Sequence, residues 1–431
     1  MSNTKTDREL IRDYLFSKLD KVMKKPYGNY KYPFVDPGSA YDGNLWDWDT
    51  FWAMYAMIGV AENEQTEPDF AEKLIECGKG NVKNFLNFQL ADGYIPMMVN
   101  EPDAAEPYLI KKHNEGEILN MHKPFLCQQI CLVSGYANDF EWIRGDLDKL
   151  KKYFECYDRY YYNEKCGLYV WADDVMIGVD NDPATFGRPR FSTASVFLNS
   201  FLVRELRSMA KICNAFGLSD DAAYYAGKAD KLVEAIQNEC YDARDGMFYS
   251  VDVDIKTRPY DWFHKGLGVF WNTLFIKVRC WSNFLPMLIG FATPEQASVL
   301  KDHIMDEKTF FSPGGIRSLS RDEKMYNLEP TGNPSNWLGP IWIIAQYAVF
   351  RGLMNYGYRA EAEELCKRTL SLLGDDLRKS GDLHEYYNPE TREPIMNPGF
   401  VNWNVLALNM ADELEGKPTP ARFLPEGAQN T

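Results

Sequence analysis

Apolar residues recur at helical spacing along most of the chain. Thr6 and Glu9 have the spacing of a capping box, and a stripe of apolar positions at intervals of three and four follows them. The same periodicity predicts helices over 69–89, 123–136, 141–160 and 193–216, over 219–238 with Ser219 as its cap, from Thr293 with Pro294 in first position, and over 342–354, 359–373 and 403–414. Gly374 would end the penultimate helix. The pattern therefore predicts an all-α protein.

Strand-like patterns are short and lie between helices, as in CGLYVW and GMFYSV. YNEKCGLY from Tyr162 and YDARDGMF from Tyr241 share a plan, each follows a helix, and YNPETREP from Tyr387 is a looser relative. The second segment starts about one unit of 73 residues after the first, and the third starts about two such units after the second. Six units of this length would fill the chain. We therefore predict one (α/α)6 barrel over residues 1–431, with short β-hairpins in its loops. Chance similarity between the segments is the alternative.

Charge and cysteine content narrow the choice of partners and compartment. The 431 residues carry a net charge of −15 without a block of Lys and Arg, so neither nucleic acid nor a membrane is expected as a partner. Nine cysteines are scattered, and Cys127 and Cys131 fit small buried apolar residues. No apolar signal segment and no run of about eighteen apolar residues occurs. We therefore expect a reduced, cytoplasmic protein.

Aromatic residues make up 14% of the chain, and many stand beside acids and amides. This mixture occurs in YDGNLWDWDT (41–50), WADDVMIGVDNDPATFGRPR (171–190), NPSNWLGPIW (333–342) and LHEYYNPETREPIMNPGFVNWN (383–404). A pyranose has an apolar face that stacks on rings and hydroxyls that bind carboxylates and amides. The stretches thus indicate a sugar site, with Trp46 and Trp48 as a platform and Asp49 on the hydroxyls. A helix start packed in the core and capped by Asp47 or Asp49 would also explain the first stretch.

Cleavage of a sugar requires two carboxyl groups, one to protonate the leaving oxygen and one to activate water or attack. Asp180 lies in GVDND beside Asp182, whose like charge could raise its pKa, and Glu385 lies in HEYYN between rings. Solvated loop carboxylates are the alternative reading of both. The five histidines have no metal-ligand spacing, and no nucleotide-binding or serine-nucleophile motif occurs, so neither metal nor cofactor is expected.

LWDWDTFW, DDVMIGVDNDP, WLGPIW and HEYYNPETREP followed by GFVNWN occur in an order that resembles glycoside hydrolase family 63 and its trehalase-like relatives. The resemblance runs from about residue 26 to residue 414 and is closest to the short members that include mannosylglycerate and glucosylglycerate hydrolases. It implies an (α/α)6 barrel and an inverting mechanism on α-linked sugars. Asp180 falls on the position of the general acid, and Glu385 falls on the position of the general base.

The resemblance also implies a set of residues that bind the substrate. Gln128 is the loosest of these matches, since HKPFLCQQ differs most from the family's pattern. The implied binding residues are Trp46, Trp48, Asp49, Tyr94, Gln128, Trp337, Trp342 and Trp403.

Three positions depart from the family pattern. Asn336 stands where the family has a Tyr, and Leu338 stands where it has an Arg. In glycerate-specific members, the aromatic residue at the first of these positions helps to hold the leaving group. Asp182 adds a negative charge near Asp180. We therefore predict an inverting, exo-acting α-glucosidase that hydrolyses small α-glucosides, with glucosylglycerate or mannosylglycerate hydrolysis as the alternative. A non-catalytic sugar-binding protein and a phosphorylase are further alternatives. The sequence leaves the sugar, its linkage and the oligomeric state open.

Overall fold

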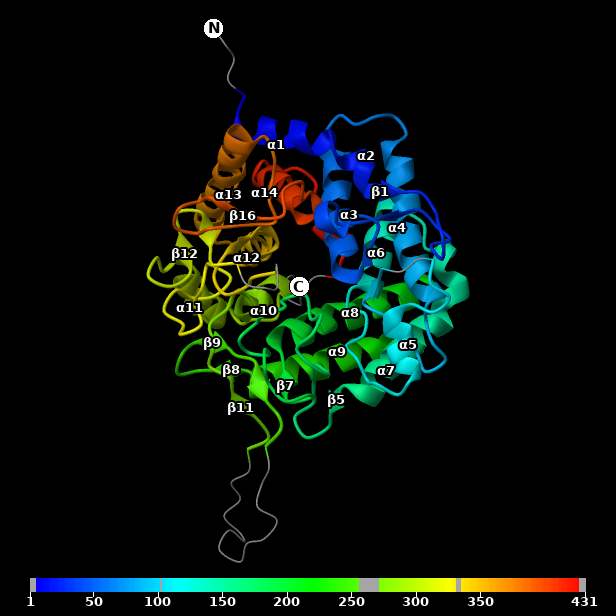
Figure 1. Ribbon diagram of the computed structural model, residues 1–431. Coiled ribbons are helices and arrows are strands. Elements are labelled where there is room, and N and C mark those ends of the chain that lie inside the picture. The colour runs from blue at the N-terminus through cyan, green and yellow to red at the C-terminus, as the bar shows by residue number, and fades with distance from the viewer. Residues whose placement is uncertain (1–4, 101–102, 256–270, 331–334, 426–431) are drawn as a thin grey trace, which may run out of the picture.

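The helices of the computed structural model form a ring (Figure 1), and the structure describes residues 5–100, 103–255, 271–330 and 335–425. The first two residues of the predicted stretch 333–342 lie outside this description. Inside the ring, each helix contacts the next, from α3 through α6, α8, α10, α12 and α14 and back to α3. Their bounds are α3 Asp47–Asn63, α6 Leu126–Ala137, α8 Val196–Ala215, α10 Leu285–Ile289, α12 Ile343–Asn355 and α14 Leu406–Leu414. The mostly helical class is therefore confirmed.

The inner helices are apolar on nearly all sides, and the outer helices are amphipathic. All residues of α3 from Asp47 to Val60 are buried, whereas α9 buries a stripe that includes Ala222, Tyr225 and Ala229. The outer helices are α1 Asp7–Phe16, α4 Phe70–Asn87, α7 Leu147–Tyr160, α9 Ser219–Glu239, α11 Pro294–Met305 and α13 Arg359–Ser380, with α2 Leu19–Val22 and α5 Tyr108–Asn114 as short additions. One cluster of buried apolar residues extends from Ile11 to Leu424.

Two predicted helix starts are confirmed in detail. Thr6 caps α1 and Thr293 caps α11, each in a capping box with the residue three positions on. The predicted cap Ser219 is wrong, since it is the first residue of α9 and makes no cap hydrogen bond. Helix 193–216 starts only at Val196, because Thr193 and Ala194 form a strand and the Ser195 side chain is the cap. The stretches 141–146 and 402–405 are 3-10 turns before α7 and α14.

Gly374 does not end a helix, and this prediction is wrong. It lies inside α13, which continues to Ser380 and ends at Gly381 with a left-handed φ of 74°. A Cβ at Gly374 would lie 2.3 Å from Oδ1 of Asp7 in α1. The glycine is therefore required by the close approach of α1 and not by a change of backbone direction.

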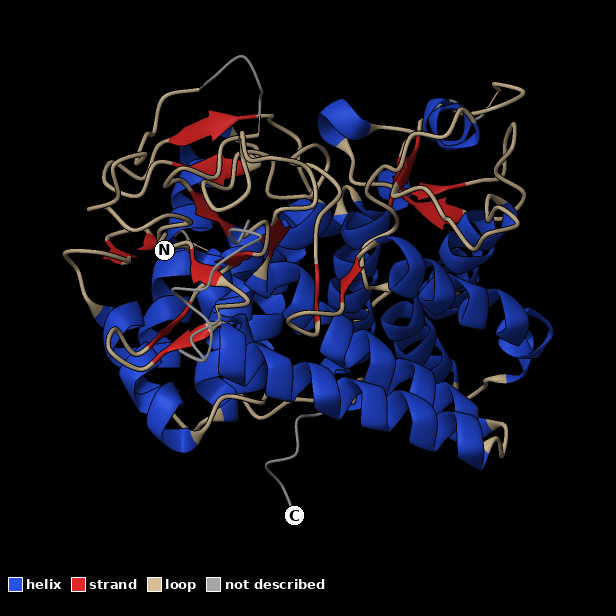
Figure 2. Ribbon diagram, turned by 90° about the horizontal axis from the view of Figure 1, so that it is seen from below, coloured by secondary structure: helices blue, strands red, loops and turns tan. Residues whose placement is uncertain are grey.

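The strands are short pairs between the helices, and most lie with the long loops on one side of the ring (Figure 2). The pairs are β1 Met23–Lys24 with β2 Phe34–Val35, β3 Leu45–Trp46 with β4 Met98–Val99, β5 Tyr162–Asn163 with β6 Leu168–Tyr169, β8 Tyr241–Asp242 with β9 Met247–Phe248, and β12 Phe311–Ser312 with β13 Gly315–Ile316. The three-stranded sheets are β7 Thr193–Ala194, β10 Val251–Asp252 and β11 Leu274–Phe275, and β14 Ile341–Trp342, β15 Tyr386–Tyr387 and β16 Pro394–Met396.

The sequence echo corresponds to a repeated hairpin. Tyr162 pairs with Tyr169 in one copy, and Tyr241 pairs with Phe248 in the other, each seven residues apart and each after an outer helix. Gly167 and Gly246 occupy the same place and both have positive φ. The looser third copy also forms a hairpin, β15 with β16, which contains a bulge.

The predicted burial of Cys127 and Cys131 is confirmed, and all nine cysteines are free and buried. Within the ranges that the structure describes, no helix combines the length and the apolar character that a membrane crossing requires.

Candidate active site

Most of the predicted site residues meet in one cavity, although they come from four separate stretches of the chain. They are joined there by Tyr41, Lys123, Gly178 and Ser335, which the sequence did not single out. The predicted residues that line the cavity are Trp46, Trp48, Asp49, Asp180, Trp337, Trp342, Glu385 and Trp403. The cavity is about 50 Å³, which is room for a few waters and less than ligand pockets usually have. A pyranose ring therefore requires the surrounding loops to move apart.

The first stretch of the cavity wall is the start of α3. Trp46 ends β3 and precedes the helix, and no side chain caps this helix end, so the predicted cap role of Asp47 or Asp49 is wrong. Asp47 is instead fully buried, with Oδ1 2.7 Å from Nζ of the buried Lys123 and Oδ2 accepting the Lys123 backbone N–H at 2.6 Å. This ion pair fixes the helix start under the cavity.

Asp49 is a buried carboxyl at the cavity wall. Its Oδ1 accepts a hydrogen bond of 2.7 Å from Nδ2 of Asn402. Burial raises the pKa of Asp49 to about 8, although the positive charge of Lys123 opposes this, and the charges of Asp47 and Glu385 raise it further. Asp49 is therefore largely protonated at neutral pH and can donate a hydrogen bond to a hydroxyl.

Glu385 enters the cavity from the strand that lines it. Glu385 directly precedes β15, which pairs with β14 so that Tyr386 lies opposite Trp342, and both Glu385 and Trp342 line the cavity. The hydroxyl of Tyr41 donates to Oε1 of Glu385 at 3.1 Å, and Nδ2 of Asn397 donates to Oε2.

The surroundings of Glu385 shift its pKa toward neutrality. Burial raises the pKa to about 7, the hydrogen bonds from Asn397 and Tyr41 lower it, and the charge of Asp180 raises it. The side chain is only 3% exposed. The alternative reading of Glu385 as a solvated loop carboxylate is therefore wrong. A carboxyl with a pKa near 7 is suited to proton transfer at neutral pH.

Asp180 lies in a loop that the rest of the cavity holds in place. Gly178 has a φ of 89°, and a Cβ there would lie 3.0 Å from Cε2 of Trp48, so only glycine fits between loop and ring. On the other side of Asp180, Asn181 accepts the backbone N–H of Trp337 at 2.7 Å and donates to Oδ1 of Asn336 at 3.1 Å. Asp180 is half-buried, and its charge acts on both Glu385 and Tyr41.

The three departures from the family pattern all turn away from the cavity. Asn336 is fully buried and binds Asn181, which holds the loop that contains Asp180. Leu338 packs against Cys280 and Leu319. Asp182 is also buried, where its Oδ1 accepts the backbone N–H of Ala184 at 3.0 Å. Burial raises the pKa of Asp182 to about 6. These side chains therefore support the loops and do not line the cavity.

The aromatic wall is a stack of indole rings. The rings of Trp337 and Trp342 are parallel, with centroids 3.9 Å apart, and Tyr386 continues the stack at 4.7 Å from Trp342. Trp48 lies 5.2 Å from Trp403 and 6.0 Å from Trp337. Rings held against one another in this way form a rigid aromatic wall.

Tyr94 and Gln128 are not brought into this cavity. Tyr94 is buried against the ring of His113, with centroids 4.0 Å apart, and donates to the carbonyl of Asn120 at 3.3 Å. Gln128 is buried in α6 and accepts a hydrogen bond of 2.6 Å from Nε of Arg204. Both side chains thus hold buried parts of the fold together and do not line the cavity.

The residues that sequence reasoning missed carry weak signals. Tyr41 opens the stretch that contains the two tryptophans, and Asn397 lies within the stretch that contains Glu385, so proximity in sequence alone could have suggested them. Lys123 gives no signal, because its partner Asp47 is 76 positions away. Among the residues with described placement, no group of three His, Cys, Asp or Glu side chains could hold a metal ion.

Comparison with known proteins identifies the family of the chain. A family model described as the mannosylglycerate hydrolase MGH1-like glycoside hydrolase domain matches residues 44–403. The match places the chain in the class of glycoside hydrolase domains. Within that class, the chain belongs to the MGH1-like family, and its resemblance to glycoside hydrolase family 63 is confirmed.

Individual relatives are distant. A probable mannosyl-oligosaccharide glucosidase of Schizosaccharomyces pombe is 26% identical over 292 residues, which cover 64% of this chain and 33% of that protein. A mannosylglycerate hydrolase of Rubrobacter radiotolerans is 23% identical over 202 residues, which cover 47% of this chain and 40% of that protein. The chain thus spans a third to two fifths of the length of these curated relatives.

A solved structure shares the fold. The crystal structure of the GH63 mannosylglycerate hydrolase from Thermus thermophilus in complex with glucose matches with a TM-score of 0.63 and 19% identity. The match covers 93% of this chain and 98% of that chain.

Proposed function

We propose that the chain is a single (α/α)6 catalytic domain that hydrolyses small α-linked glucosides from the non-reducing end, with inversion at the anomeric carbon. One observation carries the proposal: two carboxyl groups, Asp180 and Glu385, share a cavity walled by tryptophans. The closed circuit of inner-helix contacts supports the barrel, and the continuous apolar cluster supports one domain.

In the proposed reaction, Asp180 gives its proton to the glycosidic oxygen as the bond to the anomeric carbon breaks. A water molecule attacks that carbon from the opposite face, and Glu385 accepts the proton that the water loses. Tyr41 and Asn397 hold Glu385 in position. Its pKa of about 7 leaves a large part of it ionised at neutral pH and makes it a stronger base than an exposed glutamate.

Exo-action is supported by the depth of the site. The cavity ends on Trp48, which packs edge-on against Phe197 at a centroid distance of 5.7 Å, and further buried rings lie beyond it. Asp49 and Lys123 line the same cavity with polar groups. A terminal sugar ring would occupy such a closed subsite, with the leaving group toward the loops.

Hydrolysis of mannosylglycerate or glucosylglycerate is the second candidate, and the matching family model favours it. Asn336 and Leu338 argue against it, since both are buried and neither reaches the cavity where a leaving group would lie. A non-catalytic sugar-binding protein would use the same tryptophans and would need no proton transfer.

The test is a panel of α-glucosides and α-mannosides, including both glycerate conjugates, followed through the anomeric protons by NMR. Early release of the β-sugar from one glucoside is the expected result. Early release of the α-sugar would overturn inversion, and cleavage of a glycerate conjugate alone would select the second candidate. Line broadening of a sugar without cleavage would indicate the binding protein.

A further inference from the structure

A second cavity lies at the other end of the inner helices. Trp48 in the first turn of α3 faces the site described above, whereas Trp52 and Tyr55, one and two turns further along, line the second cavity. The same reversal occurs in α12, where Trp342 precedes the helix at the first cavity and Arg351 lies toward its end at the second. The second cavity is about 240 Å³, which is room for a small organic molecule.

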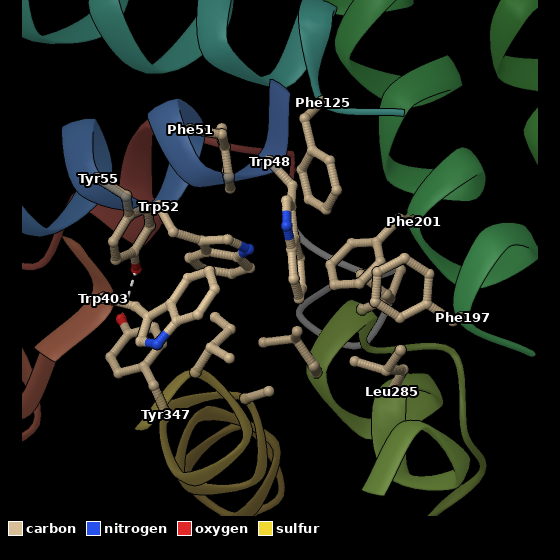
Figure 3. Close-up of a cluster of buried hydrophobic side chains, with 14 of the residues drawn as sticks. Trp48, Phe51, Trp52, Tyr55, Phe125, Phe197, Phe201, Leu285, Tyr347 and Trp403 are labelled. Atoms are coloured by element: carbon tan, nitrogen blue, oxygen red, sulfur yellow. Dashed lines mark hydrogen bonds between the residues drawn. The ribbon is translucent and has the colours of Figure 1, made fainter. Parts of the chain in front are cut away.

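Buried rings gather at the centre of the helix ring (Figure 3), and ring contacts lead from Trp48 at the first cavity through Phe197 and Phe201 to Trp52 at the second. Phe51 of α3, Phe201 of α8 and Phe125, which directly precedes α6, belong to this cluster and are buried. The centroids of Phe125 and Phe201 are 4.6 Å apart. A ligand in the second cavity would therefore not reach Asp180 or Glu385.

Arg204 brings a buried positive charge to the second cavity, and the buried carboxyl of the neighbouring Glu205 acts on it electrostatically. Its side chain lines the cavity, is 7% exposed, and makes one side-chain hydrogen bond among the described residues, from Nε to Oε1 of Gln128 at 2.6 Å. Its Nη2 has no partner there, and neither has Nε1 of Trp52, which also lines the cavity. Burial lowers the pKa of Arg204 to about 10, so the group is still charged at neutral pH. A buried charge and two buried donors without partners are costly unless a ligand satisfies them.

The other charges in the cavity wall cancel each other. Arg351 forms an ion pair with Glu413 through Nη1, and its Nη2 donates to Oδ1 of Asn355 at 2.9 Å. The remaining wall includes Leu288 and the aromatic rings of Tyr347 and Trp52. Among the described residues that line the cavity, the charge left after this pairing is the positive charge of Arg204, and its complement is a small monoanion.

We propose that this second cavity binds a small carboxylate, which accepts hydrogen bonds from Nη2 of Arg204 and Nε1 of Trp52. A carboxylate matches the two donors in number and the guanidinium in charge, and a short apolar or aromatic body matches the rest of the wall. The cavity and its charge do not depend on the function proposed for the first cavity.

The test uses benzoate as the probe and benzamide as its neutral counterpart, with the full-length chain. Calorimetry should detect benzoate binding at one site per chain, and benzamide should bind at least tenfold more weakly. Arg204→Met should weaken benzoate binding at least tenfold. The matched control is Arg207→Met on the same helix, whose side chain faces Asp230 at 3.7 Å and does not line the cavity, and it should bind benzoate as the unaltered chain does.

Two further measurements keep the test decisive if Arg204→Met folds poorly. Trp52→Phe keeps the ring and removes only the Nε1 donor, so it should weaken benzoate binding several-fold. NMR transfer of saturation from aromatic protein protons to benzoate should be lost in the same variant that loses affinity. Equal binding of benzoate and benzamide, no binding of either at millimolar concentration, or undiminished binding by a folded Arg204→Met variant would each overturn the proposal.

Discussion

Asp49 and Glu385 are buried at one end of the helix ring, and Arg204 is buried at the other. Burial is the largest cause of the pKa shift in all three, and in each it favours the neutral form. The shift brings the pKa of Glu385 to about 7, where a proton can be exchanged, but leaves that of Arg204 at about 10 and the group still charged. The same physical effect therefore suits one cavity to proton transfer and the other to holding a fixed charge.

Partners make the second difference between the cavities. The carboxyls at the first cavity accept hydrogen bonds from Tyr41, Asn397 and Asn402, whereas Nη2 of Arg204 has no partner in the described part of the chain. Both cavities retain indole donors without partners in the described part of the chain, Nε1 of Trp46 and Trp403 at the first and Nε1 of Trp52 at the second. The difference lies in the charged groups, which accept hydrogen bonds at the first cavity and keep a free donor at the second.

The largest effect is expected from removing the proton-transfer groups of the first cavity. Asp180→Asn and Glu385→Gln should each lower kcat on the substrate found by NMR by about 10²–10⁴-fold, because neither amide can exchange the proton. Glu393→Gln, on the same hairpin as Glu385 but in a surface ion pair with Lys379, is the matched control and should keep kcat. Near-normal kcat in a folded Asp180→Asn or Glu385→Gln variant would remove that residue from its role.

The next effect concerns the pH dependence of kcat/KM. Because the base must be ionised, the rate should fall as the pH drops below about 7, the pKa of Glu385. Tyr41→Phe removes a hydrogen bond that lowers this pKa, so the acid limb of the profile should move to higher pH. A limb that stays in place in Tyr41→Phe would show that Glu385 does not control it.

A smaller effect is expected on stability at the first cavity. Asp49 has a pKa of about 8 when folded and about 4 when unfolded, so the folded chain holds its proton more tightly. The resulting stabilisation is complete below about pH 4 and is lost as the pH rises toward 8. Asp49→Asn should therefore flatten the fall of Tm between pH 5 and pH 8, by on the order of 1–3 °C. An unchanged slope would contradict the raised pKa.

The smallest effect is expected at the second cavity. Arg204→Met removes a buried charge but leaves Oε1 of Gln128 without its donor, and these two changes oppose each other. The change in Tm should thus be small and equal at pH 5 and pH 8, since a group with a pKa of about 10 is charged throughout this range. A change in Tm that grows with pH would contradict a fixed charge on Arg204 in this range and thus the contrast between the two cavities.

The helical class and the repeated hairpin could be predicted from the sequence, and eight of the ten residues that it marks for the site line one cavity. Periodicity reports the buried face of a helix, and stretches that mix rings with acids are unusual enough to mark a site. Tyr94 and Gln128 were placed by motif similarity alone, and both lie in the framework, where Gln128 serves Arg204 instead. Gly374 was misplaced because a glycine at a helix end and one at a close helix contact look alike in sequence.

The sequence by itself determined which segments are helices and which loops carry carboxyls and tryptophans, because local spacing and composition encode both. Only the tertiary structure decided that Lys123 pairs with Asp47, that Asn181 and Asn336 join two distant loops, and that Arg204 lies unpaired in a second cavity. These features depend on contacts between residues far apart in the chain. The pKa of Glu385 also belongs to this second group, since burial and the nearby charge of Asp180 arise only when the loops meet.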